Sequence, residues 1–326
     1  MRKGFRHLAV AASLLVAGVV QAGAQSYPSK PITLLVPAAA GGPTDTVARL
    51  IAESMGRTLG QTILVENQGG AGGTLGMGRI AKTAPDGYTI AVWHIAHATA
   101  PALYENLKYS PLDDFDHIGR ITDVPMTLVS KTALPTKTVG EIIQWMKTQN
   151  AKATYGHAGT GSASHLCALL LMDRLGIQMT GVPFRGTGPA MNDLIGGQFD
   201  VMCDQTTGTT NQIKDGKIKG YAVTTLTKVS SLPDLPTLDQ SGMKGFEVSA
   251  WHAMWAPKGL PKEVTDKLVA ALLAALKDPK VVDRFASLGT EPVAPELATP
   301  AALRSQLASE LTKWQTVIKS AGVKGE

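Results

Sequence analysis

Two glycine-rich loops are the segments of this chain whose residue types and spacing could do chemistry. They are residues 37–45 (PAAAGGPTD) and 156–165 (GHAGTGSASH), and each lies between an apolar run typical of a strand and a run typical of a helix. Backbone N–H groups at a helix start have no partner within the helix, and the helix dipole adds positive charge there. Such a loop can bind an anion without Lys or Arg. Two of them predict two lobes that close on one small anionic ligand.

The elements that would position these loops alternate along the chain. Apolar runs predict strands at 32–37, 62–66, 88–93, 126–130, 153–156, 181–184, 199–203, 220–224 and 246–256. Helical spacing and capping residues predict helices at 44–58, 139–147, 163–175, 189–195, 262–277, 279–287 and 299–321. This alternation is typical of mostly parallel sheets covered by helices. A chain of this length exceeds what one hydrophobic core usually serves, which favours two domains.

The first residues predict export from the cytoplasm. Arg2, Lys3 and Arg6 precede an apolar stretch at 8–20, and the small residues 22–24 (AGA) form a cleavage site. A membrane anchor is the alternative, but the apolar stretch is short for a bilayer span. We therefore expect residues 1–24 to be a cleaved signal peptide and the mature protein to be soluble and periplasmic.

Cleavage also changes the charge of the protein. Loss of the three basic residues lowers Lys plus Arg from 31 to 28 against 26 acidic residues, so the net charge falls from +5 to +2. No basic block interleaved with aromatic residues remains, and we expect no nucleic-acid partner.

The two cysteines, Cys167 and Cys203, lie in an apolar helical run and near the end of a strand. An oxidising compartment permits a disulfide between them, but two thiols in so long a chain do not form a disulfide framework. The sequence favours buried free thiols. Their spacing is not that of a metal or redox site.

Ten short motifs occur in an order that resembles a known family. They are 27–32 (YPSKPI), 36–45 (VPAAAGGPTD), 65–67 (VEN), 70–73 (GAGG), 85–89 (PDGYT), 101–104 (PALY), 159–162 (GTGS), 182–186 (VPFRG), 232–237 (LPDLPT) and 256–261 (APKGLP). Together with the signal peptide, they resemble the extracytoplasmic solute receptors of the tripartite tricarboxylate transporter family, also called Bug-type receptors. The resemblance covers essentially the whole mature chain.

The resemblance implies an α/β fold of the type II periplasmic-binding-protein kind, with the ligand in the cleft between two lobes. Residues 25–124 and 249–326 would form one lobe and residues 125–248 the other. The family binds small organic acids, commonly di- or tricarboxylates or carboxylated aromatics, and passes them to a membrane permease. We expect a monomer that binds such a ligand.

The ligand contacts follow from the two loops and from the motif at 182–186. One carboxylate is expected to accept from the N–H groups of the first loop and from the hydroxyl of Thr44. The second lobe would contribute a helix start and the loop that follows it. The expected residues are Gly41, Gly42 and Thr44 in the first lobe, and Thr160, Gly161, Ser162, Ser164, Arg185 and Gly186 in the second.

Five further residues are weaker candidates for ligand contact. Asp45 can cap its helix or meet a polar group of the ligand, and His165 can donate to a carboxylate or cap a helix start. Asp204 ends a strand, where ligand-facing residues belong, and would contact a polar group or orient Arg185. Ala38 stands where the family commonly has an aromatic residue, so the pocket is expected to be larger. Trp93, His94 and His97 lie in a segment that the family keeps ligand-facing, and His97 is the candidate contact there; Trp93 would restore the missing wall or fill a core.

No enzyme motif stands against this interpretation. The chain has no G-x-S-x-G elbow and no Walker loop, and the pair His94 and His97 lacks the glutamate of a zinc site. Asp113, Asp114 and Asp116 are expected in a solvated polar loop. We therefore expect no catalytic residue, no metal and no cofactor. The rival interpretations are an exported hydrolase of small esters or amides, and a receptor of the same fold that serves a sensor kinase.

Overall fold

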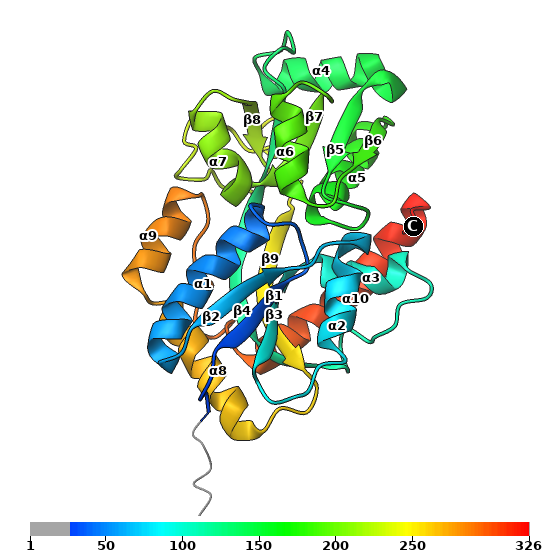
Figure 1. The fold of residues 1–326 in the computed structure, drawn as a ribbon. Helices are drawn as coiled ribbons and strands as arrows, with labels where there is room; N and C mark the ends of the chain where they lie inside the picture. The colour runs from blue at the N-terminus through cyan, green and yellow to red at the C-terminus, as the bar shows by residue number, and fades with distance from the viewer. Residues whose placement is uncertain (1–26, 326) are drawn as a thin grey trace, which may run out of the picture.

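The computed structural model describes residues 27–325, in which two lobes lie one above the other (Figure 1). The expected signal peptide at 1–24 lies outside the described residues. The first and last thirds of the chain build the lower lobe, and the middle of the chain builds the upper one. Among residues 27–325, none of the helices combines the length and the apolar character that a bilayer span requires.

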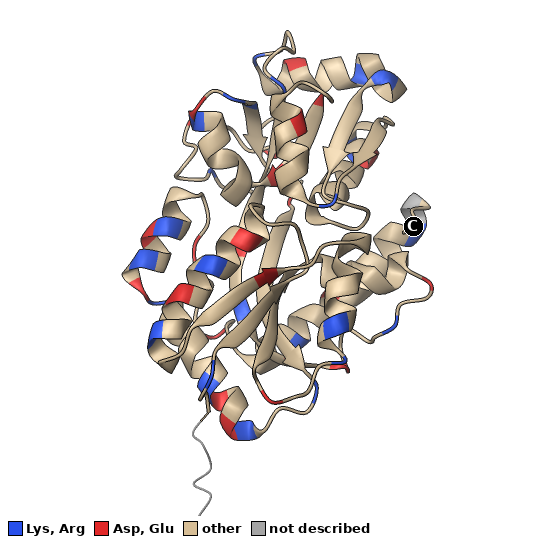
Figure 2. Ribbon diagram, in the orientation of Figure 1, with Lys and Arg blue, Asp and Glu red and all other residues tan. Residues whose placement is uncertain are grey.

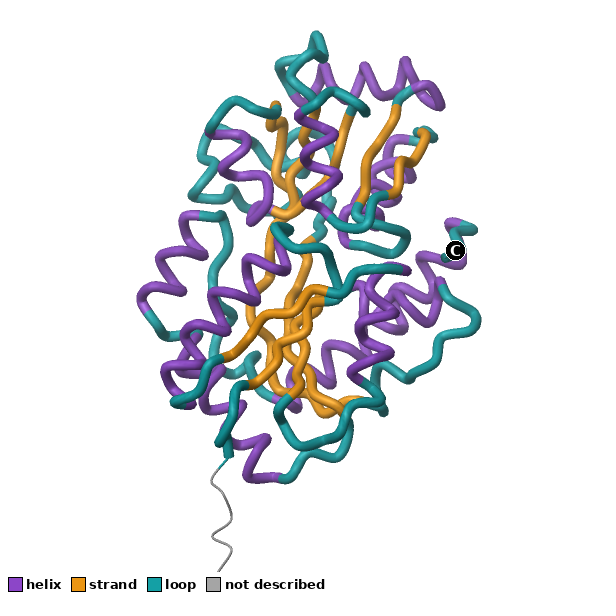
Figure 3. Tube along the Cα trace, viewed as in Figure 1, coloured by secondary structure: helices purple, strands orange, loops and turns teal. Residues whose placement is uncertain are grey.

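In the lower lobe, helices cover both faces of a sheet. Strands β1 (Ile32–Val36), β2 (Ile63–Asn67) and β3 (Thr89–His94) are parallel, and β9 (Ser249–Pro257) runs antiparallel beside β3. One face packs against α1 (Pro43–Leu59), α8 (Lys262–Ala275) and α9 (Pro279–Ser287), and the other against α2 (Thr74–Ile80), α3 (Ala96–Leu103) and α10 (Pro300–Ala321) (Figure 3). A short 3₁₀ turn, η1 (Ala71–Gly73), precedes α2. The apolar stripe of α1 is fully buried at Val47, Ile51 and Met55, so the predicted amphipathic helix docks its apolar side on the sheet.

The upper lobe repeats this plan on a smaller scale. Its strands are β5 (Thr154–His157), β6 (Thr180–Pro183), β7 (Val201–Gln205) and β8 (Lys219–Val223), with β5 parallel to both β6 and β7. Its helices are α4 (Val139–Gln149), α5 (Ala163–Leu175), α6 (Thr187–Ile195) and α7 (Thr206–Lys214), and a 3₁₀ turn, η2 (Asn150–Lys152), follows α4. The α5, α6 and α7 helices each begin where a strand has just ended, which places their N-termini at one edge of the sheet.

The strand β4 (Phe115–Ser130) connects the lobes. It pairs antiparallel with β9 from Phe115 to Pro125, and then with β7 and β8 from Met126 onward. The complete sheet is therefore mixed rather than mostly parallel, because the strands at the junction run antiparallel to their neighbours. Thr224 fastens the junction, since its hydroxyl donates to the carbonyl of Val248 at 2.6 Å and accepts from the N–H of Met126 at 3.0 Å.

Asp116 is one of three acidic residues expected in a solvated polar loop, and for this residue the expectation is wrong. Asp116 lies within the strand, where its carboxylate accepts from the N–H groups of Gly259 and Leu260 at 2.8 Å and pairs with Lys258. Its partners are on the turn after β9, so this acidic residue fixes a strand connection instead of facing open solvent.

Candidate functional site

A cavity of about 530 Å³ lies between the two lobes. Its lining comes from the loop after β1, the glycine-rich turn around η1, the end of β3, Tyr104 after α3, the loops after β5 and β6, and the end of β7. Both glycine-rich loops predicted from the sequence therefore meet at the same cavity.

Four helices of nine residues or more begin at this cavity, two more than the sequence analysis identified. The N-cap residues of α1, α5, α6 and α7 are Gly42, Ser162, Gly186 and Gln205, and all four line the cavity. The unpaired N–H groups and dipoles of these helices create positive potential in the cleft. Among the described residues that line the cavity, the exposed Arg185 is the one cationic side chain. The other described Lys and Arg residues lie on helices, strands and loops outside the cavity lining (Figure 2).

The hydroxyl of Thr44 is already committed within the protein. The ring nitrogen Nδ1 of His252 lies 3.0 Å from the carbonyl of Ala250, which can only accept, so Nδ1 carries the proton. Burial lowers the pKa of His252 to about 4, so its ring is neutral near pH 7 and its Nε2 accepts from Thr44 Oγ1 at 3.1 Å. The backbone N–H of Thr44, rather than its hydroxyl, can therefore donate to a ligand carboxylate.

The second loop keeps one hydroxyl proton available. Ser162 Oγ accepts from the N–H of His165, Ser164 Oγ accepts from the N–H of Ala158, and the two hydroxyls are 3.0 Å apart. One of their two protons joins the two serines, and the other can point into the cavity. The ring of His165 accepts from the N–H of Gly161 at 3.2 Å, and burial lowers its pKa to about 3. Gly161 and His165 therefore shape the loop and do not line the cavity.

Asp45 and Gly41 also support the first loop from outside the cavity. The Oδ2 atom of Asp45 accepts from the N–H of Gly41 and from Nε of Arg49, each at 2.9 Å. Burial raises the pKa of Asp45, but the hydrogen bonds from Arg49 and Gly41 outweigh it and leave that pKa lowered. Asp45 therefore holds the loop before α1 in place and does not cap an N–H group of the helix itself.

The structure places His97 in the core and His94 at the cavity. His97 is fully buried against Tyr109, Phe115 and Trp255, and burial lowers its pKa to about 3. His94 lines the cavity, and its Nδ1 accepts from the N–H of Ala96 at 3.1 Å, which leaves Nε2–H as a donor. Sequence reasoning named the segment but selected the wrong imidazole for the cavity, because it did not show that the strand ends at His94 and that His97 already belongs to the following helix, α3.

The remaining sequence candidates line the cavity in two groups. Ala38 and Trp93 line the cavity from the first lobe, and the centroid of the Trp93 ring is 3.9 Å from that of His94, on which it stacks. Trp93 is thus part of the cavity wall and is packed in the core of the first lobe as well. From the second lobe, the lining candidates are Thr160, Ser162, Ser164, Arg185, Gly186 and Asp204.

Asp204 is the one buried acidic side chain among the described residues that line the cavity. Its Oδ1 accepts from the hydroxyl of Thr187 at 3.3 Å, while Oδ2 has no hydrogen-bond partner. Burial raises the pKa of Asp204 to about 7. No ion pair joins it to Arg185 within the described residues.

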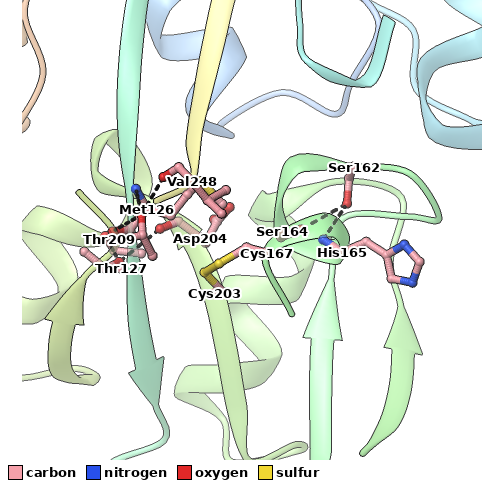
Figure 4. Close-up of a disulfide and its surroundings, with 11 residues drawn as sticks. Met126, Thr127, Ser162, Ser164, His165, Cys167, Cys203, Asp204, Thr209 and Val248 are labelled. Atoms are coloured by element: carbon pink, nitrogen blue, oxygen red, sulfur yellow. Dashed lines mark hydrogen bonds between the residues drawn. A yellow bond between two sulfur atoms is a disulfide. The ribbon is translucent and has the colours of Figure 1, made fainter. Parts of the chain in front are cut away.

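Cys167 and Cys203 form a disulfide, so the expectation of free thiols is wrong. Figure 4 shows the bridge joining α5, which is capped by Ser162 and carries Ser164 and His165, to the strand that contains Asp204. The Cα atoms are 6.0 Å apart, within the range that a disulfide requires. The sequence shows that both cysteines lie in apolar runs. It does not show that the fold brings α5 and β7 together, so the disulfide could not be predicted.

The lobes are closed on each other along the rim of the cavity. Tyr104 Oη donates to the carbonyl of Thr160 at 3.3 Å, and Thr99 Oγ1 donates to that of Gly161 at 3.2 Å. On the opposite rim, a Cβ atom added at Gly208 of α7 would lie 3.1 Å from Cγ of Pro43. Glycine at this helical position therefore gives α1 room to approach the second lobe.

We expect Gly208→Ala to lower the affinity for ligand without lowering the stability of the protein. Alanine stabilises a helix interior by about 1 kcal/mol relative to glycine, so the unliganded protein should unfold at an equal or higher temperature. Ligand affinity should fall about fivefold to tenfold, because the new methyl group crowds Pro43 only when the lobes close. Calorimetric titration and thermal unfolding measure the two effects.

Gly140→Ala is the matched control, because Gly140 lies in α4 and an added Cβ there meets no atom within 4 Å. It should raise stability and leave affinity unchanged. Equal affinities for the two variants would show that the Gly208 contact does not limit closure.

The described residues contain no group of His, Cys, Asp and Glu side chains arranged to hold a metal ion.

Residues 47–323 match the family model described as "Tripartite tricarboxylate transporter family receptor". The chain is 53% identical over 317 residues to the "UPF0065 protein in the TAR-I ttuE-ttuC' intergenic region" of Agrobacterium vitis, covering 97% of this chain and 92% of that protein. It is also similar to the periplasmic binding protein BugD, with 50% identity, a TM-score of 0.89, and coverage of 91% of this chain and 99% of BugD. MatC of Rhodopseudomonas palustris with bound malate is 40% identical with a TM-score of 0.86, covering 90% of this chain and all of MatC (100%).

Proposed function

The chain belongs to the tripartite tricarboxylate transporter receptor family, and from this premise we propose that it captures a small organic acid in the periplasm and delivers it to a membrane permease. The two-lobed fold of periplasmic binding proteins, expected from the sequence, is confirmed. The single observation that carries the ligand class is the convergence of four helix N-termini on one closed cavity. Di- and tricarboxylates and aromatic carboxylates are the proposed ligands.

The cavity favours anions through hydrogen bonds from the main chain. A hydrogen bond to a charged group is worth roughly 1.5–3 kcal/mol net. Three or four such bonds, less the entropy of association and closure, correspond to an affinity of about −8 kcal/mol, or a micromolar Kd. Ordered water can complete the contacts of a carboxylate with the first loop.

Closure is the proposed signal to the permease. Residues 25–124 with 249–326 and residues 125–248 are the proposed lobes, which would rotate about the junction of β4 and β9. A ligand that contacts both lobes stabilises the closed state by its differential affinity for that state. We propose that a monomer, freed of its signal peptide, presents this closed surface to the transporter.

The geometry favours binding over catalysis. At the cavity, the hydroxyl of Thr44 pairs with the imidazole of His252, which is the arrangement of a nucleophile and its general base. Burial lowers the pKa of His252 to about 4, which makes its ring a weak base near pH 7. We therefore propose that the protein is not an enzyme, and that a bound acid is released unchanged.

Thermal unfolding against a panel of mono-, di- and tricarboxylates tests this proposal. Ligand that copurifies is first removed by unfolding and refolding the mature protein with its disulfide intact. A ligand at one hundred times its Kd should add about 2.7 kcal/mol to stability and raise the midpoint. A shift with one narrow group of acids, recovered unchanged afterwards, is the expected result. No shift with any carboxylate would refute the proposed class, and conversion of a panel member would favour the hydrolase.

A further inference from the structure

The backbone and the side chains at the cavity offer opposite hydrogen-bonding groups. The helix starts present N–H donors, which suit a carboxylate. Asp204, by contrast, presents an acceptor. Its side chain is completely buried at the cavity wall, and Oδ2 has no partner there. A buried acceptor without a donor costs free energy, so this oxygen marks the place where a ligand must supply a hydrogen.

Two neighbours reinforce this acceptor character. Gln205, which follows Asp204 and lines the same wall, has an amide oxygen with no partner. Thr44 reaches the cavity from the other lobe, but its proton is directed to His252, so its hydroxyl oxygen can only accept from a ligand. The two sides meet here, because Gly42 beside Thr44 approaches Thr187, whose hydroxyl donates to Asp204.

Neighbouring groups of the protein satisfy the Asp204 carboxyl group only in part. The backbone N–H of Gln205 lowers its pKa, but among the described residues no group makes a hydrogen bond to Oδ2. Thr127 Oγ1 donates to the backbone carbonyl of Asp204 and not to its carboxylate. Thr187 occupies Oδ1, at the long distance of 3.3 Å. The side chain therefore is held in place at one oxygen and leaves the other for a ligand.

We propose that Asp204 is a specificity-determining residue, and that the ligand is a carboxylate carrying a hydroxyl or ammonium group that donates to Oδ2. This inference rests on the proposed function and narrows it, since it separates 2-hydroxy and 2-amino acids from plain dicarboxylates of equal length. A site built around a buried acceptor rejects an analogue without the donor, because that acceptor is then left unpaired.

Matched acids measured by calorimetric titration at pH 8 test the inference. Succinate lacks the donor, malate adds a hydroxyl, and aspartate adds an ammonium group, so the last two distinguish the source of the donated hydrogen. If the panel selects another chain length, the corresponding plain, hydroxy and amino acids replace them. The wild-type protein should bind one or both donor-bearing acids at least tenfold more tightly than the plain acid.

Asp204→Asn should abolish that preference. The variant keeps the shape of the side chain, and with Oδ1 still accepting from Thr187 it places an NH₂ donor where Oδ2 was. Binding of the plain acid should be retained, which also shows that the variant folds. The control is Asp193→Asn, because Asp193 lies on α6 outside the cavity lining and its replacement removes the same charge. It should leave the ratio unchanged.

Three outcomes would overturn the inference. They are equal affinities of the wild-type protein for the matched acids, a preference that survives in Asp204→Asn, and loss of all the acids together in that variant. Each of these leaves carboxylate binding by the wild-type protein, and so the proposed function, intact. Failure of every carboxylate in the panel would instead refute both.

Discussion

Acidification from pH 7.5 to pH 5.5 is expected to destabilise the unliganded protein by several kcal/mol. The six histidines among the described residues are all buried. Burial lowers the pKa of four of them to about 3 or 4, and lowers that of His94 and His157 as well. The four are His97, His117, His165 and His252.

Stability falls on acidification because the unfolded chain binds protons at a higher pH than the folded protein does. In the unfolded chain a histidine binds a proton below about pH 6.5, whereas in the folded protein these four remain neutral down to about pH 4. Stability is therefore lost as the pH falls through 6.5, by roughly 1.4 kcal/mol per pH unit for each group. At pH 5.5 the four together remove roughly 5 kcal/mol, which is comparable with the total stability of many proteins.

The titration of Asp204 has the opposite effect on stability and offsets about one of these protons. Burial raises its pKa to about 7, so between about pH 7 and pH 4 the folded protein binds a proton that the unfolded chain does not. Urea unfolding at pH 7.5, 6.5 and 5.5 measures the net effect as the slope of stability against pH. His97→Asn should reduce that slope by one proton, whatever its effect on stability at pH 7.5. A stability independent of pH over this range would show that the imidazoles titrate normally.

Removal of the disulfide is the second change expected to have a large effect. Cys167 and Cys203 are 36 residues apart in sequence, and closing a loop of that size stabilises a protein by about 3–4 kcal/mol in the chain-entropy description. The double variant Cys167→Ala, Cys203→Ala should lose that much in urea unfolding. It should also bind ligand more weakly, because the bridge holds the helix that begins at Ser162 against the strand that presents Asp204.

Replacing the cysteines also removes the packing of their two sulfur atoms. Dithiothreitol is the control for that loss, because it breaks the bridge and leaves both sulfur atoms in place. The reductant should destabilise the wild-type protein nearly as much as the substitutions do, and should not affect the variant. Stability that does not change in either experiment would show that the bridge contributes nothing to the native state.

Much of the fold could be predicted because it depends on local signals. The helices α5 and α9 begin and end at the predicted residues, since Ser162 and Asp278 cap them and Gly176 ends the first. Strand β4 could not be predicted beyond its last residues. It contains the charged residues Asp116, Arg120 and Asp123, of which Asp116 pairs with Lys258 after β9 and Arg120 pairs with Asp123. Only the tertiary structure shows that this polar run is a central strand.

Part of the candidate site could also be predicted from local signals. Glycine, threonine and serine before a helix indicate the two loops, because the signal is local. The N-termini of α6 and α7 carry weaker signals, and α7 begins after Gln205 without a side-chain cap. The pairing of Thr44 with His252 joins residues 208 positions apart, and no pattern within either segment could reveal it.

The use of main-chain groups to hold the anion has a consequence for how such proteins diverge. A point mutation can replace Thr44, Trp93 or Asp204, but it cannot delete the N–H groups at the starts of α1, α5, α6 and α7 unless it introduces proline. A duplicated gene can thus change the walls of the cavity, and with them the cargo, while every intermediate still holds a carboxylate. Selection can explore new nutrients step by step, because no step begins from a protein that has ceased to bind.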